Sequence, residues 1–146
     1  MKIAIGCDHG GINLKQSVID AIVEHGDQYV DYGTFSTESV DYPVYAALAA
    51  KSVVGGETDL GILICGTGIG MSIAANKIHG IRCGHVTTPE CARLTREHND
   101  ANMIALGGRI TDETTAREIV KAFLDAEFAG GRHARRVEMI NNLEEN

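Results

Sequence analysis

Five short apolar runs alternate with segments of helical periodicity, and this alternation constrains the fold more than any other feature. The runs lie at Lys2–Cys7, 28–32, Leu60–Cys65, 81–86 and 102–106. Strands that alternate with helices form βαβ units, whose parallel strands make a sheet covered by helices on both faces. The sequence therefore predicts an α/β, three-layer, Rossmann-like fold. We expect a five-stranded parallel sheet in the flavodoxin-like strand order 2-1-3-4-5.

The segments between these runs carry signals for the beginnings and ends of helices. Gly26 stands where the first helix should end, and Pro43 fits the first position of the second helix. For a later helix, Thr88 is expected as the capping residue and Pro89 as the first helical position. Further helices are expected from residue 69 or so to about 79, from 113 to 128, and, as an extra C-terminal helix, from 133 to 143.

Length, charge and cysteine spacing exclude several classes of protein. The chain has 146 residues, which predicts a single domain over 1–146, and its net charge of -7 argues against a partner nucleic acid. Neither an apolar run long enough to cross a membrane nor a signal segment is found, so we expect a cytoplasmic protein. The four cysteines lack zinc or redox spacing and the six histidines include no H-x-x-x-H pair, so no metal site is expected.

The third apolar run leads into a glycine-rich turn, ILICGTGIGMSIAANK, at residues 62–77. Its glycines, Gly66, Gly68 and Gly70, have neither the G-x-G-x-x-G register of a dinucleotide site nor the Lys of a Walker loop. Glycines in such a turn let backbone N–H groups converge on an anion, aided by the start of the next helix. A tight turn without a ligand would need the same residues, so the segment alone leaves these two interpretations open, and with them a nucleotide site.

Cys65 stands where this strand meets the turn. A cysteine at a strand end is often a small buried apolar residue. Beside N–H groups and a helix start, however, its thiolate should be favoured, which would suit a base or a nucleophile. Asp8 and His9 follow the first strand, and in the expected order both strands end at the switch point, where α/β sheets bind ligands.

Positive charge gathers near the C-terminus in the stretch GGRHARRVEMI at residues 130–140. Arg132 and Arg136 are four positions apart and therefore share a helix face. A solvated basic surface would explain them. In an acidic chain, a local arginine cluster is also a reasonable clamp for a phosphate group.

Taken together, these motifs resemble the ribose-5-phosphate isomerase type B family, which also includes galactose-6-phosphate isomerase subunits. The segments that carry the resemblance are GCDHGG (6–11), DYP (41–43), ICGTGIGMSIAANKIHGIRC (64–83), EHNDAN (97–102), GGR (107–109) and GGRHARRVEMI (130–140). They occur in the family's order and spacing over nearly the whole chain.

The resemblance implies an aldose–ketose isomerase that acts on ribose 5-phosphate through a cis-enediolate, with no metal and no cofactor. It implies that Cys65 is the base, that Thr67 shuttles a hydroxyl proton and that His98 assists opening of the sugar ring. The substrate-binding residues that it implies are Asp8, His9, Tyr42, Gly66, Gly68, Ile69, Gly70, Asn99, Arg109, Arg132 and Arg136.

The expected topology separates two of these residues. His98 precedes the fifth strand and so lies at the amino edge of a parallel sheet, whereas Cys65 ends the third strand at the carboxyl edge. A symmetric homodimer, in which each site borrows His98 from its neighbour, would unite them, and the family forms dimers with sites at the interface. Whether dimers pair into a tetramer is open.

Two alternative functions also remain: isomerisation of a hexose 6-phosphate such as allose or galactose 6-phosphate, and a non-catalytic phosphate-binding module.

Overall fold

The computed structural model describes residues 1–145 and contains one five-stranded parallel sheet. The strands are β1 (Lys2–Cys7), β2 (Gln28–Asp31), β3 (Leu60–Cys65), β4 (Cys83–His85) and β5 (Met103–Gly107). The helices are α1 (Ile12–His25), α2 (Tyr42–Val54), α3 (Ile69–Ala75), α4 (Pro89–Asn99), α5 (Glu113–Asp125) and α6 (Arg132–Asn142), followed by the 3-10 turn η1 (Leu143–Glu145). The predicted α/β class, parallel sheet and extra C-terminal helix are confirmed.

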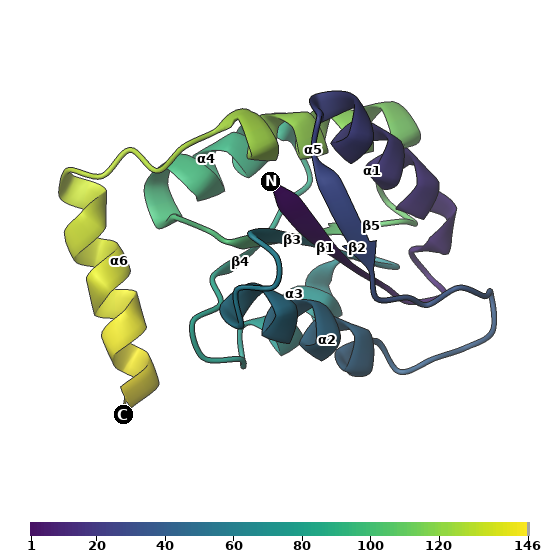
Figure 1. Cartoon of the computed structure of the whole chain (residues 1–146), viewed down its shortest axis with the longest axis horizontal. Coiled ribbons are helices and arrows are strands. Elements are labelled where there is room, and N and C mark those ends of the chain that lie inside the picture. Colours follow the sequence, from purple (N-terminus) through teal and green to yellow (C-terminus); the bar gives the residue numbers. More distant parts are fainter. Residues whose placement is uncertain (146) are drawn as a thin grey trace.

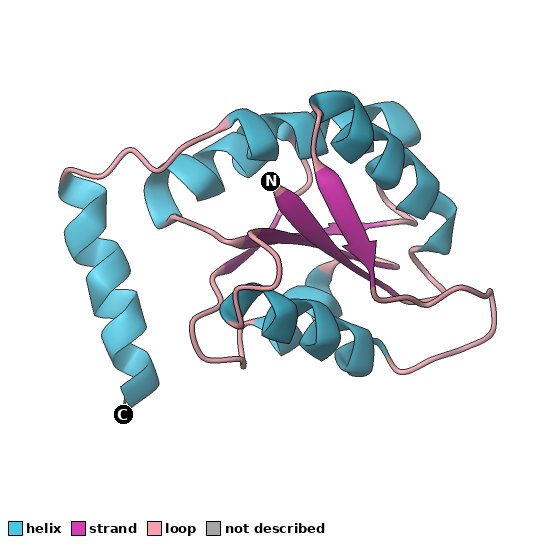
Figure 2. Ribbon diagram, viewed as in Figure 1, coloured by secondary structure: helices cyan, strands magenta, loops and turns pink. Residues whose placement is uncertain are grey.

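Helices cover both faces of the sheet, with α1, α4 and α5 on one side and α2 and α3 on the other (Figures 1 and 2). Alternate residues of each central strand face opposite layers, as the two-residue period of a strand requires. In β3, Ile62 and Ile64 join the core beneath α1 and α5, while Leu63 and Cys65 join the core beneath α2 and α3. The sequence of β3 therefore aims the Cys65 side chain at the α2–α3 layer.

The strand order is β2-β1-β3-β5-β4, so the predicted order 2-1-3-4-5 is wrong at one edge. β5 is buried along its whole length and pairs on both sides, with β3 and with β4. β4 has three residues, of which His85 is exposed. Short, partly polar strands suit sheet edges, and fully apolar ones suit the centre. The adjacency of β1 and β3, on which the switch point depends, is unaffected by this exchange.

Most helix boundaries follow the predicted signals. Gly26 adopts the left-handed conformation (φ 95°) at the end of α1, and the Thr88 side chain accepts a hydrogen bond from the Cys91 N–H. Two predicted helix ends are wrong by a few residues, and the predicted start of the last helix differs by one. α3 ends at Ala75 rather than near 79, because Asn76 turns back to bond both the N–H and the carbonyl of Cys83. Likewise α5 ends at Asp125, and α6 begins at Arg132.

α6 stands apart from the three layers (Figure 1). Its first turn lies near the end of α4, and η1 is held by Glu144, which accepts hydrogen bonds from the Gly80 N–H at 3.0 and 3.1 Å. Val137 is buried, whereas Met139, Ile140 and Leu143 are exposed. Within residues 1–145, these three apolar side chains stay exposed, and exposed apolar stripes are typical of interaction surfaces.

Candidate functional site

Two loops meet at the carboxyl edge of the sheet, one after β1 and one after β3. The Asp8 N–H donates to the Ile64 carbonyl at 3.1 Å, which continues the pairing of the two strands beyond their ends. A Cβ built on Gly10 would lie 2.9 Å from the Gly66 nitrogen, so the loops touch through their backbones. The structure thus brings the predicted Asp8, His9 and Cys65 segments together at the switch point.

Cys65 is 5% exposed and its sulfur accepts a hydrogen bond from the Gly68 N–H at 3.1 Å. Gly68 has φ 82°, a left-handed conformation that costs glycine little and that directs its N–H back toward the strand end. The interaction strengthens when the sulfur carries negative charge. α3 then starts at Ile69, and the first amides of a helix have no partner within it. A thiol and a set of backbone donors therefore share one turn.

Three side chains lie against the glycines of this turn: Arg109 at Gly66, His85 at Gly68 and Tyr42 at Gly70. A Cβ on Gly66 would be 3.0 Å from an Arg109 guanidinium nitrogen, and one on Gly70 would be 2.7 Å from Cζ of Tyr42. The glycines are therefore needed for close approach as well as for conformation. Thr67 is exposed, and its carbonyl accepts a hydrogen bond from Nε2 of His85 at 2.8 Å. Sequence reasoning did not find His85, because the weak β4 pattern gave no indication that it faced the turn.

Asp8 and His9 have different surroundings in the first loop. Asp8 is 6% exposed, and its Oδ1 accepts the Gly10 and Gly11 N–H groups at 2.8 and 3.1 Å, which fixes the loop. His9 is half-buried, and its Nδ1 accepts the Val40 N–H at 3.1 Å. Since Nδ1 is the acceptor, the proton of the neutral ring is on Nε2, which makes that nitrogen a hydrogen-bond donor.

A second cluster lies at the other edge of the sheet, where α4 ends and α6 begins. The ring of His98 stacks on that of His133, with centroids 4.3 Å apart and planes inclined by 12°. Desolvation lowers the pKa of His133, and the positive charges of His98, Arg132 and Arg136 lower it further. These four side chains therefore form a compact electropositive group. His133 was not predicted, although it stands inside the quoted GGRHARR motif.

The two clusters are separated by the length of β5. Cys65 pairs with Gly107, the last residue of β5, whereas His98 and the exposed Asn99 precede Met103, the first. Each strand residue rises about 3.3 Å, so the two edges are about 13 Å apart even before the loops are added. Within one chain the structure joins Asp8, His9, Tyr42 and Arg109 to the turn at 66–70, but it leaves His98, Asn99, Arg132 and Arg136 elsewhere.

Comparison with known proteins supplies the remaining evidence. A family model described as Ribose/Galactose Isomerase matches residues 3–140. Ribose-5-phosphate isomerase B of Escherichia coli is 51% identical over 144 residues, covering 99% of this chain and 97% of the relative. The chain belongs to the ribose/galactose isomerase family. It is accordingly an isomerase.

Two further relatives show the range of the family. A structure of ribose-5-phosphate isomerase B from Clostridium thermocellum superposes with a TM-score of 0.97 at 52% identity, covering 99% of this chain and 98% of that one. Galactose-6-phosphate isomerase subunit LacB of Clostridium acetobutylicum is 37% identical, covering 99% of this chain and 83% of the relative. The fold is thus that of the family, and substrates of different length occur within it.

Among residues 1–145, no group of three or more His, Cys, Asp and Glu side chains is arranged to hold a metal ion. Over the same residues, no helix has the length and apolar character needed to cross a bilayer. The four cysteines are free thiols.

Proposed function

We propose that the chain interconverts ribose 5-phosphate and ribulose 5-phosphate through a cis-enediolate. The observation that carries this proposal is the placement of the Cys65 sulfur, hydrogen-bonded to the Gly68 N–H, inside a glycine turn lined by Arg109 and Tyr42. Family membership and the names of the two type B relatives support ribose 5-phosphate as substrate. A simple phosphate-binding module would need the glycines and arginines but not the thiol.

In the proposed reaction, Cys65 removes the proton from C2 of the open-chain aldose and returns it to C1. The electron pair left on carbon moves into the enediolate, whose oxygens are held by backbone N–H groups of residues 66–70. Thr67 moves the hydroxyl proton between the two oxygens, which completes the aldose-to-ketose conversion. A thiolate is a weak base for a carbon acid, so the oxyanion must be stabilised by fixed donors, each contributing roughly 3–4 kcal/mol.

We propose that the second cluster reaches this turn from a neighbouring copy of the chain. In a symmetric homodimer, His98 of one chain would assist ring opening at the other chain's Cys65, Asn99 would bind the sugar, and Arg132 and Arg136 would receive the phosphate with Arg109. Exposed apolar side chains support a self-interface: Val44 and Leu48 on α2, Ile69 and Ile73 on α3, and Ile140 on α6. A tetramer built from two such dimers is compatible with this arrangement.

Complementation tests the shared site. Chains carrying Cys65→Ala and chains carrying His98→Ala are mixed, unfolded and refolded together, and assayed on cyclic ribose 5-phosphate under conditions where ring opening limits the rate. Random pairing makes roughly half the dimers mixed, and one of their two sites regains both groups, so activity should approach about a quarter of the parent's. If mixed dimers form but show only the average of the two single variants, both residues act within one chain.

Substrate length is tested by kinetics on ribose 5-phosphate, allose 6-phosphate and galactose 6-phosphate. The family description and the LacB relative make a hexose 6-phosphate the alternative substrate. The proposal expects the highest kcat/KM for ribose 5-phosphate, because one extra carbon displaces the phosphate from arginines positioned for the shorter chain. A higher kcat/KM for either hexose 6-phosphate would make that sugar the substrate, and the type of reaction, aldose–ketose isomerisation, would stay as proposed.

We further propose that no metal takes part and that the protein is cytoplasmic. The turn at 66–70 already supplies donors for the oxyanion, and free thiols suit a reducing compartment. Exhaustive dialysis against EDTA should leave kcat and KM unchanged. Loss of activity that a divalent ion restores would contradict the metal-free mechanism.

A further inference from the structure

Lys15 is a buried charge that the proposed chemistry does not use. It lies on α1, and the residue is 8% exposed. Its ammonium group contacts the Asp31 carboxylate at 2.8 Å, donates to the Thr34 carbonyl at 2.5 Å and sits 4.3 Å from the centre of the Phe35 ring. A buried ammonium is retained only where partners replace its hydration, and here every partner belongs to one segment.

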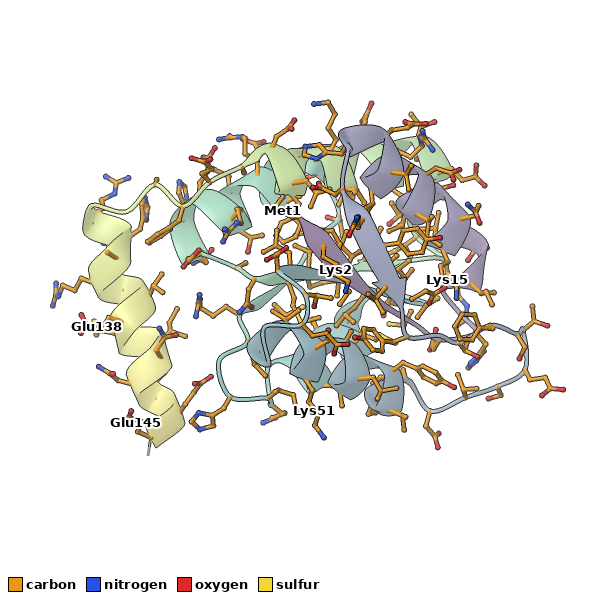
Figure 3. All side chains as sticks on the ribbon, viewed as in Figure 1. Met1, Lys2, Lys15, Lys51, Glu138 and Glu145 are labelled. Carbon is orange, nitrogen blue, oxygen red and sulfur yellow. The ribbon has the colours of Figure 1, made fainter. Side chains whose placement is uncertain are left out.

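That segment is the end of β2 and the loop that leads from it to α2 (Figures 1 and 3). The same loop is hydrogen-bonded to the end of β1. The Cys7 N–H donates to the Gly33 carbonyl at 2.6 Å, and the Thr34 N–H donates to the Cys7 carbonyl. Asp31 adds a bond through its second oxygen, which accepts the Gly33 N–H at 2.9 Å. Lys15 thus holds the start of the loop against α1, while the backbone bonds of Cys7 hold it against β1.

The other end of the same loop reaches the candidate site. The Val40 N–H donates to Nδ1 of His9, which fixes the tautomer of that ring and the direction of its Nε2–H. Two residues later, Tyr42 packs against Gly70 in the turn that follows Cys65. The loop at 32–41 therefore links the Lys15 cluster to both of these contacts, and it contains no helix or strand.

We propose that Lys15 is a positioning residue for the isomerase site, whose buried ammonium fixes the loop at 32–41 so that His9 presents Nε2–H, and Tyr42 its ring, toward the Gly66–Gly70 turn. The inference rests on the proposed function for its kinetic consequence. Its structural part, the state of His9, stands independently. The ammonium group of Lys15 contacts Asp31, Thr34 and the Phe35 ring, so it acts through the loop rather than on the substrate.

The test uses Lys15→Met, which keeps the length of the side chain and removes its charge. The matched control is Lys121→Met, since Lys121 also pairs with a carboxylate, Asp125 at 2.5 Å, but on the exposed surface of α5. Both variants are assayed on ribose 5-phosphate well below their melting temperatures. Lys15→Met should lower kcat/KM at least tenfold, Lys15→Arg should recover part of the loss, and Lys121→Met should match the parent.

A second measurement separates positioning from simple destabilisation. Nitrogen-15 NMR of the imidazole rings, with His9 assigned by comparison with His9→Gln, should show an Nε2–H ring in the parent and a mixture of tautomers in Lys15→Met. Lys15→Met leaves the Asp31 carboxylate without its cationic partner. If that variant does not fold, the double variant Lys15→Met, Asp31→Asn, which also removes the charge of Asp31, takes its place. A lower melting temperature with unchanged kcat/KM and an unchanged His9 spectrum would overturn the proposal.

The two readouts also separate this inference from the proposed function. If the parent chain does not isomerise ribose 5-phosphate, the proposed function fails, yet the His9 spectrum still decides whether Lys15 fixes the ring. If the parent is active but the His9 spectrum of Lys15→Met is the same as that of the parent, the positioning role fails and the isomerase assignment stands.

Discussion

The two clusters differ in how completely the fold of one chain organises them. At the carboxyl edge, Cys65 and Asp8 are almost fully buried, and backbone N–H groups donate to both side chains. At the amino edge, Arg132 and Arg136 are exposed, and the ring of His98 is half-buried and stacks on that of His133. The first cluster is preorganised by strand ends and tight turns. The second gathers like charges at the surface, which is favourable only when an anion or another surface joins it.

The largest effect that this comparison predicts is the loss of the base. Cys65→Ala should lower kcat/KM about 1,000-fold on both cyclic and open-chain ribose 5-phosphate, since a positioned base contributes roughly 10²–10⁴ in rate. Cys83→Ala is the matched control, because burial raises the pKa of that thiol to about 12 and its backbone bonds Asn76 at the end of α3, whereas the turn precedes the start of α3. Steady-state kinetics on both substrate forms make the measurement.

His98→Ala should behave differently from Cys65→Ala, because ring opening precedes the proton transfer. Activity should fall on the cyclic sugar and persist on the open-chain form. If Cys65→Ala keeps activity within tenfold of the parent, Cys65 is not the base. Equal losses for His98→Ala on the two forms would place His98 in the proton transfer itself and remove the distinction between the clusters.

A smaller effect is expected at the arginines of the amino edge. Arg136→Ala should raise KM for ribose 5-phosphate about 10- to 100-fold, and lower kcat as well if the phosphate positions the reacting carbons. Lysine at this position should rescue only part, because it lacks the bidentate fork. Arg135→Ala, which removes an equally exposed neighbour, should change KM little. Equal activity of the parent on ribose and on ribose 5-phosphate would show that no phosphate clamp exists.

The sequence predicts the carboxyl edge better than the rest of the molecule, and the reasons are local. Leu60–Cys65 is uniformly apolar and ends in a glycine turn, so periodicity and turn chemistry define both the strand and the loop. The exchange of β4 and β5 depends on burial: Arg82, Gly84 and His85 interrupt the apolar run at 81–86, which marks an edge strand, whereas Met103–Leu106 is apolar throughout. The predicted order 2-1-3-4-5 instead places the fourth strand beside the third, because strands that follow one another in the chain are commonly neighbours.

Contacts between distant segments were beyond the sequence alone. His133 stacks on His98 across 35 positions, and nothing in either local pattern selects the partner. Lys15 has the helical spacing of an ordinary polar residue, yet it is buried because Asp31, Thr34 and Phe35 fold over it. Such positions are determined by the loops that connect the elements, whose paths a pattern of apolar residues does not specify.

The smallest predicted effect concerns a third region, which belongs to neither cluster. His25, at the end of α1, contacts Asp125 through Nε2 at 2.8 Å and Asp27 through Nδ1 at 2.7 Å. The hydrogen bond to Asp125 raises the pKa of His25, and the bond to Asp27 adds to it against some desolvation. Burial by itself raises the pKa of Asp27, but bonds from the N-terminal ammonium and His25 leave it lowered.

The sign of the pH dependence follows from these shifts. A raised histidine pKa gives stability that is complete below the unfolded value of about 6.5 and is lost as the pH rises through the folded pKa. The lowered pKa of Asp27 adds stability that is present above about pH 4 and is lost as the pH falls through the folded pKa. The free energy of unfolding of the parent should therefore exceed that of His25→Gln most between about pH 4.5 and 6.5. The expected difference is about 0.5–1 kcal/mol, the size of other partly exposed pairs.

Urea unfolding of both proteins at pH 5.5 and 8.5, at one protein concentration, measures this difference, while kcat/KM on ribose 5-phosphate measures activity. Because the bonding partners of His25 are Asp27 and Asp125, which belong to neither cluster, His25→Gln should change stability with pH and leave kcat/KM as in the parent. An equal stability difference at both pH values would mean that the imidazole is not charged in the folded protein. A change in kcat/KM without one in stability would show that the α1–α5 surface communicates with the site, and the division of the molecule into two functional edges would have to be redrawn.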